Sequence, residues 1–176
     1  ARRHDSNLYY EASVAGGIPI IKVLREGLGG NRITRLYGIL NGTCNFILTQ
    51  MQEREVDFDE AVAEAQAQGF AEADASLDVD GHDAAHKAGI LASLAHGFWV
   101  NPKRVYTEGI RRITPLDLEF AETLGYTIKL LGIVKGNGGP PVQVSVYPAL
   151  IPSGHVMASV GGVFNAILVR GDVVGD

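Results

Sequence analysis

The sequence predicts an α+β domain, in which a mixed β-sheet carries helices on one face and uses its other face or an edge for oligomerisation. The predicted elements follow the order β-α-β-α-α-α-β-α-β-β-β, which lacks the steady alternation of a doubly wound sheet. The 176 residues, 46% of them apolar, can bury one sizeable core and fit one domain better than two. Helices on one side leave the other face of the sheet in need of a cover, which a second subunit or a missing domain would supply.

The first predicted elements are a strand, a tight turn and a helix. The apolar run from Leu8 to Val14 predicts a strand, and residues 1–7 resemble the last turn of a preceding helix. A helix is expected from Ile18 to Leu28, because Pro19 is typical of a first helical turn and Gly29-Gly30 of a helix end. The glycines between strand and helix lack the G-x-G-x-x-G spacing of a dinucleotide site and predict only a tight turn.

A second strand and two more helices follow. Alternating residues predict a strand from Arg32 to Leu40, and Asn41-Gly42 is expected to lead into a helix. Asp57 and Glu60 have the spacing of a capping box at the start of the next helix, Phe58 to Gln68. The remaining expected elements are a lysine-bearing helix ending near His96, a strand at 105–113, a helix from Thr114-Pro115 to Leu124, and strands at 127–134, 142–147 and 163–169.

Composition excludes several classes of protein. A formal net charge of -5 without a basic cluster argues against nucleic-acid binding. A single cysteine, Cys44, rules out an internal disulfide, and we expect it to be a small buried side chain rather than a nucleophile. No apolar run approaches the roughly 18 to 20 residues of a membrane span, so we expect a soluble, cytoplasmic protein. The start at Ala1 rather than Met indicates a fragment or a processed product.

The most informative stretch is rich in acids. The 31 residues from Glu53 to Asp83 hold eleven of the chain's twenty acids and one basic residue, Arg54. The acids of the 58–68 helix fit its solvated face and need no function. The acids that remain are Glu72, Asp74, Asp78 and Asp83, which lie in and after an irregular segment. Loop residues can aim side chains at a ligand, and an ammonium group or a metal ion would suit these.

Asp83 and Lys87 are the candidate catalytic pair. With Asp80 as a possible N-cap, helical geometry places Asp83, Lys87 and Leu91 on one narrow stripe. A lysine in register with leucines points toward the interior or a cleft, where burial disfavours its charged form and a carboxylate one turn away favours it. Such a pair could exchange a proton near neutral pH. The alternative is an ordinary surface ion pair worth about 0.3 to 0.5 kcal/mol.

Three segments closely resemble homoserine dehydrogenases, in order and over nearly the whole chain. They are Tyr10-Glu11-Ala12-Ser13-Val14-Ala15-Gly16-Gly17-Ile18-Pro19-Ile20-Ile21, Leu40-Asn41-Gly42-Thr43-Cys44-Asn45-Phe46, and Gly69-Phe70-Ala71-Glu72-Ala73-Asp74-Ala75 through Asp78, Asp80-Gly81, Asp83 and Lys87. The resemblance covers residues 1–176 as that family's catalytic and dimerisation region and lacks its nucleotide-binding region. It implies reversible hydride transfer between NAD(P)H and aspartate 4-semialdehyde, giving L-homoserine.

The resemblance also implies roles for individual residues. Lys87 matches the proton donor, and Asp83 the acid that binds substrate and positions this lysine. The implied substrate pocket further comprises Glu72, which holds the substrate ammonium, with Asp78, Gly42, Thr43 and Phe70. Gly69 matches a glycine that touches the nicotinamide end of the cofactor. The implied monovalent cation site, usually for sodium, consists of main-chain oxygens of Glu11, Val14, Gly16 and Ile18.

Two other functions remain open from the sequence. One is the substrate domain of another amino-acid-pathway dehydrogenase, and the other is a non-catalytic dimerisation or ligand-sensing module whose acids bind a cation. His82 and His86 flank Asp83, but neither is favoured as a catalytic residue. Because the nucleotide-binding region is absent, we expect the isolated chain to fold and self-associate without binding NAD(P)H tightly or turning over homoserine. The residues that discriminate NAD from NADP belong to that absent region.

Overall fold

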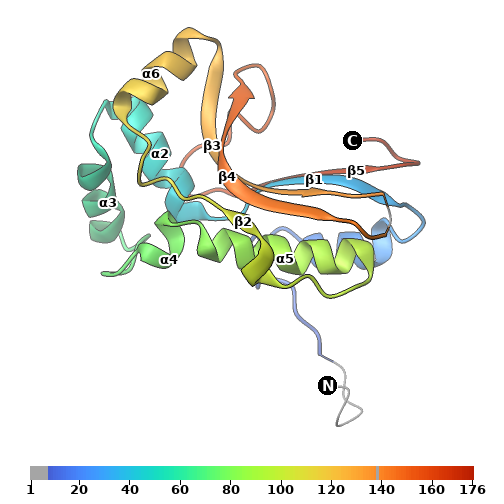
Figure 1. Cartoon of the computed structure of the whole chain (residues 1–176). Helices are drawn as coiled ribbons and strands as arrows, with labels where there is room; N and C mark the ends of the chain where they lie inside the picture. The colour runs from blue at the N-terminus through green and yellow to red at the C-terminus, as the bar shows by residue number, and fades with distance from the viewer. Residues whose placement is uncertain (1–7, 138) are drawn as a thin grey trace.

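The computed structural model describes residues 8–137 and 139–176, and in these residues the predicted α+β class is confirmed (Figure 1). A five-stranded sheet has the order β2-β4-β3-β1-β5. Its strands are β1 (Ile33–Ile39), β2 (Tyr106–Thr107), β3 (Tyr126–Lys135), β4 (Gln143–Pro152) and β5 (Ala166–Gly171). The sheet is mixed, because β2 pairs with β4 in parallel while the other pairings are antiparallel.

The helices gather on one side of the sheet and at its end, with α5 running beneath the strands (Figure 1). They are α1 (Ile20–Lys22), the π-helix η2 (Val23–Gly27), α2 (Gly42–Arg54), α3 (Phe58–Ala67), α4 (Ser76–Val79), α5 (His82–His96), the 3-10 helix η3 (Pro102–Arg104) and α6 (Pro115–Thr123). In the described part of the chain, none of these helices has the length and apolar character that crossing a membrane requires.

The predicted strand from Leu8 to Val14 is wrong. Residues 11–17 form successive turns, which fold back onto the start of α1. The reason is Glu11, whose carboxylate accepts the backbone N–H groups of Ile21 at 2.7 Å and Lys22 at 3.0 Å. This contact satisfies donors at a helix start and takes the segment away from the sheet. The helical turn expected in residues 1–7 lies outside the described residues.

Most predicted helix starts are confirmed, because their caps form as expected. The side chains of Asn41 and Asp57 each accept a backbone N–H in the first turn of their helix, and Thr114 and Asp117 form a complete capping box at the start of α6. Asp80 does not cap α5. The N-cap of that helix is Gly81, whose φ of 82° suits a glycine, and the Asp80 carboxylate binds Arg111 instead.

The strand predicted at 105–113 shortens to Tyr106–Thr107. After Thr107 the chain leaves the sheet edge and packs against α4, where the N–H of Ile110 donates to the carbonyl of Val79 at 2.8 Å. Gly109 permits this approach, since a Cβ built at that position would lie 2.0 Å from the Val79 carbonyl oxygen. A tertiary contact with α4 therefore overrides the strand preference of this segment.

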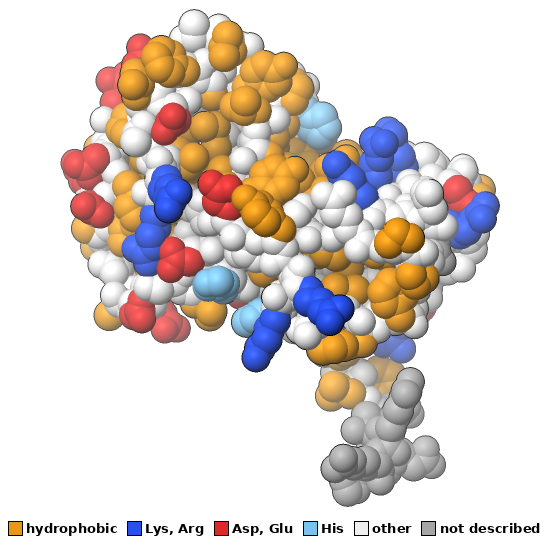
Figure 2. All heavy atoms as spheres, in the orientation of Figure 1, with side chains coloured by type: hydrophobic (Ala, Val, Ile, Leu, Met, Phe, Trp, Pro, Cys, Tyr) orange, Lys and Arg blue, Asp and Glu red, His pale blue; other side chains and the backbone are white. Residues whose placement is uncertain are grey.

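The two faces of the sheet are covered differently. The main core lies between the strands and the helices and includes Leu36, Val134 and Val146. On the opposite face a second apolar cluster contains Ile39, Leu131, Ile133, Ile151 and Met157, packed with half-buried side chains such as Tyr37 and Leu168. Away from the sheet, acidic side chains gather on the side of the molecule where α3 lies (Figure 2). The acids of α3 thus occupy a solvated surface, as expected.

Candidate active site

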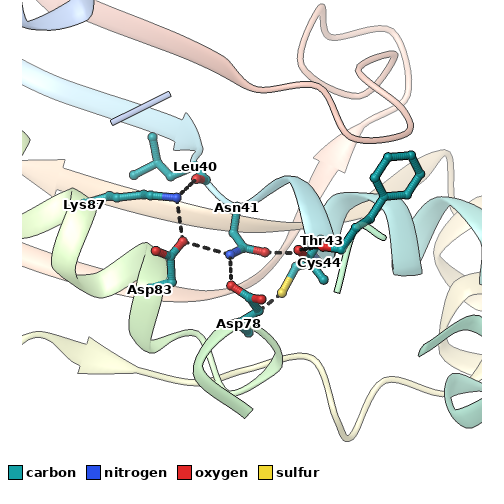
Figure 3. A network of polar contacts seen from close by, with 8 residues as sticks. Leu40, Asn41, Thr43, Cys44, Asp78, Asp83 and Lys87 are labelled. Atoms are coloured by element: carbon teal, nitrogen blue, oxygen red, sulfur yellow. Dashed lines mark hydrogen bonds and ion pairs between the residues drawn. The ribbon is translucent and has the colours of Figure 1, made fainter. Parts of the chain in front are cut away.

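Lys87 lies beside the junction between β1 and α2 (Figure 3). Its Nζ donates to Asp83 Oδ2 at 2.7 Å and to the carbonyl of Leu40 at 3.1 Å. The side chains of Lys87 and Asp83 are 25% and 23% exposed. The ammonium group is therefore held at a defined place by two acceptors, and part of the lysine side chain remains exposed.

Asn41 joins the two acids nearest to Lys87. Its Nδ2 donates to Asp78 Oδ1 at 2.7 Å and to Asp83 Oδ2 at 2.8 Å, while its Oδ1 accepts the backbone N–H of Cys44 at 2.8 Å (Figure 3). The side chain of Asn41 is buried. The sequence reasoning assigned this residue no role in the site, although an asparagine at a predicted helix start was a signal that its side chain would be fixed.

Cys44 is a buried structural side chain, as predicted. Its Sγ donates to the carbonyl of Asp78 at 3.1 Å, which adds a further link between α2 and the segment that carries the acids. Burial raises the pKa of the Cys44 thiol well above its ordinary value, and the negative charges of Asp78 and Asp83 raise it further. The thiol therefore stays protonated and is unsuited to act as a nucleophile.

A tight turn after α3 brings Gly69 and Phe70 to the start of α2. Gly69 has φ of 76°, and the N–H of Phe70 donates to the carbonyl of Ala65 in the manner of a Schellman motif. Thr43 Oγ1 then donates to the carbonyl of Phe70 at 2.7 Å, and the rings of Phe70 and Phe46 have centroids 5.0 Å apart. The predicted site residues Thr43, Phe70 and Gly69 are thus neighbours.

Gly42 lies where two segments of backbone approach closely. A Cβ built on Gly42 would lie 2.6 Å from the carbonyl oxygen of Val163, in the segment that leads to β5. Only glycine fits this position without a shift of backbone. The first turn of α2, with Asn41 at its cap, is therefore enclosed between the acid-bearing segment and the chain that precedes β5.

The four acids selected from the sequence do not form one cluster. Asp78 and Asp83 meet at Asn41, whereas Asp74 accepts the backbone N–H of Ser76 at 3.0 Å. Hydrogen bonds from the side chain and the backbone of Ser76 lower the pKa of Asp74. Glu72 is exposed, and its carboxylate makes no hydrogen bond or ion pair with any residue that the structure describes.

The residues expected to hold a cation share one turn. Glu11, Val14, Gly16 and Ile18 lie in the turn segment before α1, and Gly16 has φ of 56°. The carbonyls of Glu11 and Ile18 accept the N–H groups of Val14 and Ile20, while those of Val14 and Gly16 accept no hydrogen bond from the residues described. Within residues 8–137 and 139–176, no three or more His, Cys, Asp or Glu side chains are grouped so that they could hold a metal ion.

The arrangement suits proton transfer to a bound substrate. An ammonium group fixed by one carboxylate and one carbonyl can pass a proton to an oxygen atom placed beside it. Two carboxylates within reach of the same amide provide negative charge for a cationic group of that substrate. His82 and His86 are exposed on α5, and in the described residues they are not hydrogen-bonded to this network.

Comparisons with known proteins match this chain to homoserine dehydrogenases over nearly its whole length. The homoserine dehydrogenase family profile matches residues 19–176. A homoserine dehydrogenase of Pseudomonas aeruginosa is 50% identical over 175 residues, which are 99% of this chain and 40% of that protein. The chain thus spans about two fifths of the length of this curated relative.

Two solved structures share the fold. The crystal structure of a homoserine dehydrogenase from Thiobacillus denitrificans has a TM-score of 0.90 and 52% identity, and the match covers 94% of this chain and 38% of that one. A hyperthermophilic archaeal homoserine dehydrogenase in complex with NADPH has a TM-score of 0.81 and 32% identity, with 99% of this chain and 49% of that one covered.

Proposed function

The chain belongs to the homoserine dehydrogenase family, and on this premise we propose that residues 1–176 form the catalytic and dimerisation region of an enzyme that interconverts L-homoserine and aspartate 4-semialdehyde. The observation that carries the proposal is the position of Lys87, whose ammonium group is 2.7 Å from Asp83 Oδ2 and 3.1 Å from the Leu40 carbonyl. The reaction needs an acid beside the aldehyde oxygen, and Lys87 is a fixed, partly accessible acid.

Lys87 is the proposed proton donor. In the direction of aldehyde reduction, its Nζ gives a proton to the oxygen that becomes the hydroxyl of homoserine, and in the reverse direction it takes that proton back. Asp83 is the proposed residue that holds Lys87 in place and binds substrate. The ion pair between them supports this assignment, since losing it would free a flexible four-carbon side chain.

The proposed substrate pocket extends from this pair to the turn after α3. Glu72 is the proposed partner of the substrate ammonium, and its carboxylate is exposed and unengaged by the described residues. Asp78 adds negative charge next to Asp83 through their shared contact with Asn41. Gly42, Thr43 and Phe70 are proposed to line the pocket with main-chain groups, and the hydrogen bond from Thr43 to Phe70 holds the latter two together.

The proposed cofactor is NAD(P), which supplies or accepts the hydride when bound. Of this chain, Gly69 is the residue proposed to contact its nicotinamide end. The structure fits that role, because a Cβ built on Gly69 would meet no atom within 4 Å, so the turn faces open space. The remainder of the cofactor would be held by a nucleotide-binding region joined to this chain.

A monovalent cation, most simply Na⁺, is the proposed ligand of the turn before α1. Main-chain oxygens of Glu11, Val14, Gly16 and Ile18 are the proposed ligands. Two of these carbonyls, those of Val14 and Gly16, accept no hydrogen bond within the described residues, which suits oxygen coordination of a hard cation. The proposed role of the cation is to fix this turn against the start of α1.

A second copy of the chain is the proposed cover for the open face of the sheet. This face carries an apolar cluster around Ile39, Leu131 and Ile133, and a depression of about 290 Å³ lies beside it, lined in part by Tyr37 and Leu168. Burial of such a surface favours association. Sedimentation of the chain as a monomer at micromolar concentration would contradict a homodimer built on this face.

A steady-state assay tests the proposal. The complete enzyme, in which this chain is joined to its nucleotide-binding region, should reduce NAD⁺ or NADP⁺ with homoserine and not with an amino acid that lacks the hydroxyl group. The isolated 176-residue chain should not turn over homoserine, because the hydride carrier has no binding region. Normal turnover by the isolated chain, or none by the complete enzyme, would overturn this assignment.

A further inference from the structure

We propose that Asn41 is a positioning residue of this site, whose side-chain amide holds Asp78 and Asp83 together and thereby fixes Lys87. The inference rests on the proposed function for its catalytic consequence. It stands on three hydrogen bonds of one buried side chain: Nδ2 to Asp78 Oδ1 at 2.7 Å, Nδ2 to Asp83 Oδ2 at 2.8 Å, and Oδ1 from the N–H of Cys44 at 2.8 Å.

The three contacts leave the amide only one orientation. A primary amide has two donor hydrogens on nitrogen and an acceptor oxygen. Here both hydrogens go to carboxylates and the oxygen takes the backbone N–H that the helix start must satisfy. Rotating the amide by 180° would place its oxygen against two carboxylates and its nitrogen against an N–H donor. The cap of α2 therefore sets the direction of the two donors.

The amide lets two carboxylates approach without a cation between them. Two carboxylates repel each other at short range, and a neutral donor that hydrogen-bonds to both offsets part of that repulsion. The charged and titratable groups around this contact are Asp78, Asp83 and Lys87, with the Cys44 thiol behind them and Asp80 paired to Arg111 beyond. Lys87 neutralises Asp83 directly, and Asn41 is the donor that Asp78 and Asp83 share.

Lys87 and Asn41 share one acceptor atom. Asp83 Oδ2 accepts from both Lys87 and Asn41, and the other acceptor of Lys87 is the carbonyl of Leu40, the residue before Asn41. Two successive residues directly after β1 thus hold both members of the ion pair. If the Asn41 donors were lost, Asp83 would be free to rotate and to carry Lys87 away from the substrate oxygen.

The decisive variant is Asn41→Asp in the complete enzyme. Aspartate caps a helix as well as asparagine does, so the N–H of Cys44 keeps its acceptor. Both donor hydrogens are lost, however, and ionisation would place a third carboxylate beside Asp78 and Asp83. We expect turnover of homoserine to fall about tenfold or more, which is the scale of losing one hydrogen bond to a charged group. The ratio of variant to wild-type kcat should fall further as pH rises and the introduced carboxyl group ionises.

Asn101→Asp is the matched control. Asn101 is also an N-cap asparagine, and its Oδ1 accepts the N–H of Lys103 at 3.0 Å at the start of η3. The kcat and the pH profile of Asn101→Asp should match those of the wild type. Asn41→Ser, which keeps a cap oxygen and one donor without adding charge, should lose turnover without the added pH dependence. If Asn41→Asp does not fold, wild-type turnover in Asn41→Ser overturns the proposal.

Thermal unfolding separates this proposal from the proposed function. A carboxyl group forced between two others takes up a proton on folding, so the Tm of Asn41→Asp relative to wild type should fall as pH rises from about 5 to 8, by roughly 2 to 4 °C. Asn101→Asp should show no such trend. This readout needs no substrate, so it holds even if the enzyme does not oxidise homoserine. A pH-independent Tm difference together with wild-type kcat would overturn the role of Asn41.

Discussion

Lys87 and Lys129 lie on different elements, α5 and β3, yet each ammonium group is held by one main-chain carbonyl and one side-chain oxygen. Lys87 has the carbonyl of Leu40 and a carboxylate oxygen of Asp83. Lys129 has the carbonyl of Val160 at 2.8 Å and the amide oxygen of Asn45 at 3.1 Å. The two sites differ in charge, because a carboxylate balances the ammonium group of Lys87 whereas Lys129 has only neutral oxygen acceptors and links α2 to the segment before β5.

Exposure completes the contrast. The Lys87 side chain is 25% exposed and can meet a ligand, whereas Lys129 is buried. Burial lowers the pKa of Lys129 from 10.5 to about 8, and the negative charge of Glu53 opposes this shift. Lys129 therefore weakens the folded state while it is charged, and its contacts with α2 and the chain before β5 offset that cost. A depressed lysine pKa alone does not identify a catalytic lysine.

Helix α2 connects the two lysines. Asn41 at its cap holds the carboxylate that binds Lys87, and Asn45 one turn later accepts from Lys129. Asn45 also donates to the carbonyls of Val160 and Phe164, at 3.0 and 3.2 Å. The position of this one helix therefore matters both for the candidate active site and for the packing of the segment that leads to β5.

The largest expected effect is on Lys87. Replacing it with methionine in the complete enzyme should lower kcat about 10²- to 10⁴-fold, because the proposed general acid is lost while the length of the side chain is kept. Steady-state kinetics with homoserine measure this, and far-ultraviolet circular dichroism checks that the variant is folded. Lys103→Met, at an exposed lysine of η3, is the control and should keep wild-type kcat. Turnover within about twofold of wild type in Lys87→Met would mean that Lys87 only forms an ordinary ion pair and has no part in catalysis.

Asp83→Asn should have the next largest effect, because it gives Lys87 the same kind of partners that Lys129 has. The exchange keeps the shape of the side chain and removes its charge, so we expect kcat to fall about 10- to 100-fold, the scale of a hydrogen bond between charged groups. Asp80→Asn is the matched control, since Asp80 pairs with Arg111 away from Lys87. Equal kcat values in the two variants would show that the charge on Asp83 has no part in turnover.

The pH dependence of stability should report Lys129. Because its pKa falls from 10.5 in the unfolded chain to about 8 in the folded one, the folded state binds fewer protons between these values. Stability should therefore rise with pH through this window, by on the order of 3 kcal/mol in total. Urea unfolding at about pH 7.5 and 10 gives the free energy of unfolding of wild type and of Lys129→Met. In the difference between the two proteins, the contributions of the other titrating groups cancel. A constant difference between the two proteins would mean that the Lys129 ammonium is not destabilised by burial.

Much of the fold could be predicted from the sequence because local signals agreed with tertiary packing. Asn41, Asp57 and Thr114 are cap residues that fix where α2, α3 and α6 begin. The failures lie where a distant contact decides. Residues 8–14 look like a strand, but the Glu11 carboxylate binds the start of α1. The 105–113 segment leaves the sheet because α4 offers a partner that no local pattern could reveal.

The candidate site was predicted in part. Helical spacing alone placed Asp83 and Lys87 together, and the ion pair between them is confirmed. The remaining contacts join residues far apart in the chain: Leu40 with Lys87, and Asn41 with Asp78 and Asp83. Periodicity cannot show such pairs, because they arise from the packing of β1 and α2 against the acid-bearing segment. For the same reason the sequence could not show that Asp80 turns toward Arg111.

The smallest expected effect comes from Gly42. It is the first residue of α2, and this helix carries the contacts of Asn41 and Asn45 at the two lysine sites. In Gly42→Ala the new methyl group would lie 2.6 Å from the Val163 carbonyl oxygen, so α2 or the segment before β5 must move. We expect a loss of about 1 to 3 kcal/mol in the free energy of unfolding, typical of an overpacked contact. The better helix propensity of alanine returns at most about 1 kcal/mol of this.

Gly161→Ala provides the comparison, because it lies in the same segment without such a clash. Its new Cβ would be 3.5 Å from Thr49 Cγ2, an ordinary contact, and alanine should leave stability unchanged or raise it by up to about 1 kcal/mol. Urea unfolding of both variants at one pH measures the contrast. If Gly42→Ala were as stable as Gly161→Ala, the first turn of α2 would be free to shift. In that case the position of α2 would not determine the contacts that Asn41 and Asn45 make at the two lysine sites, and those contacts would instead determine the position of α2.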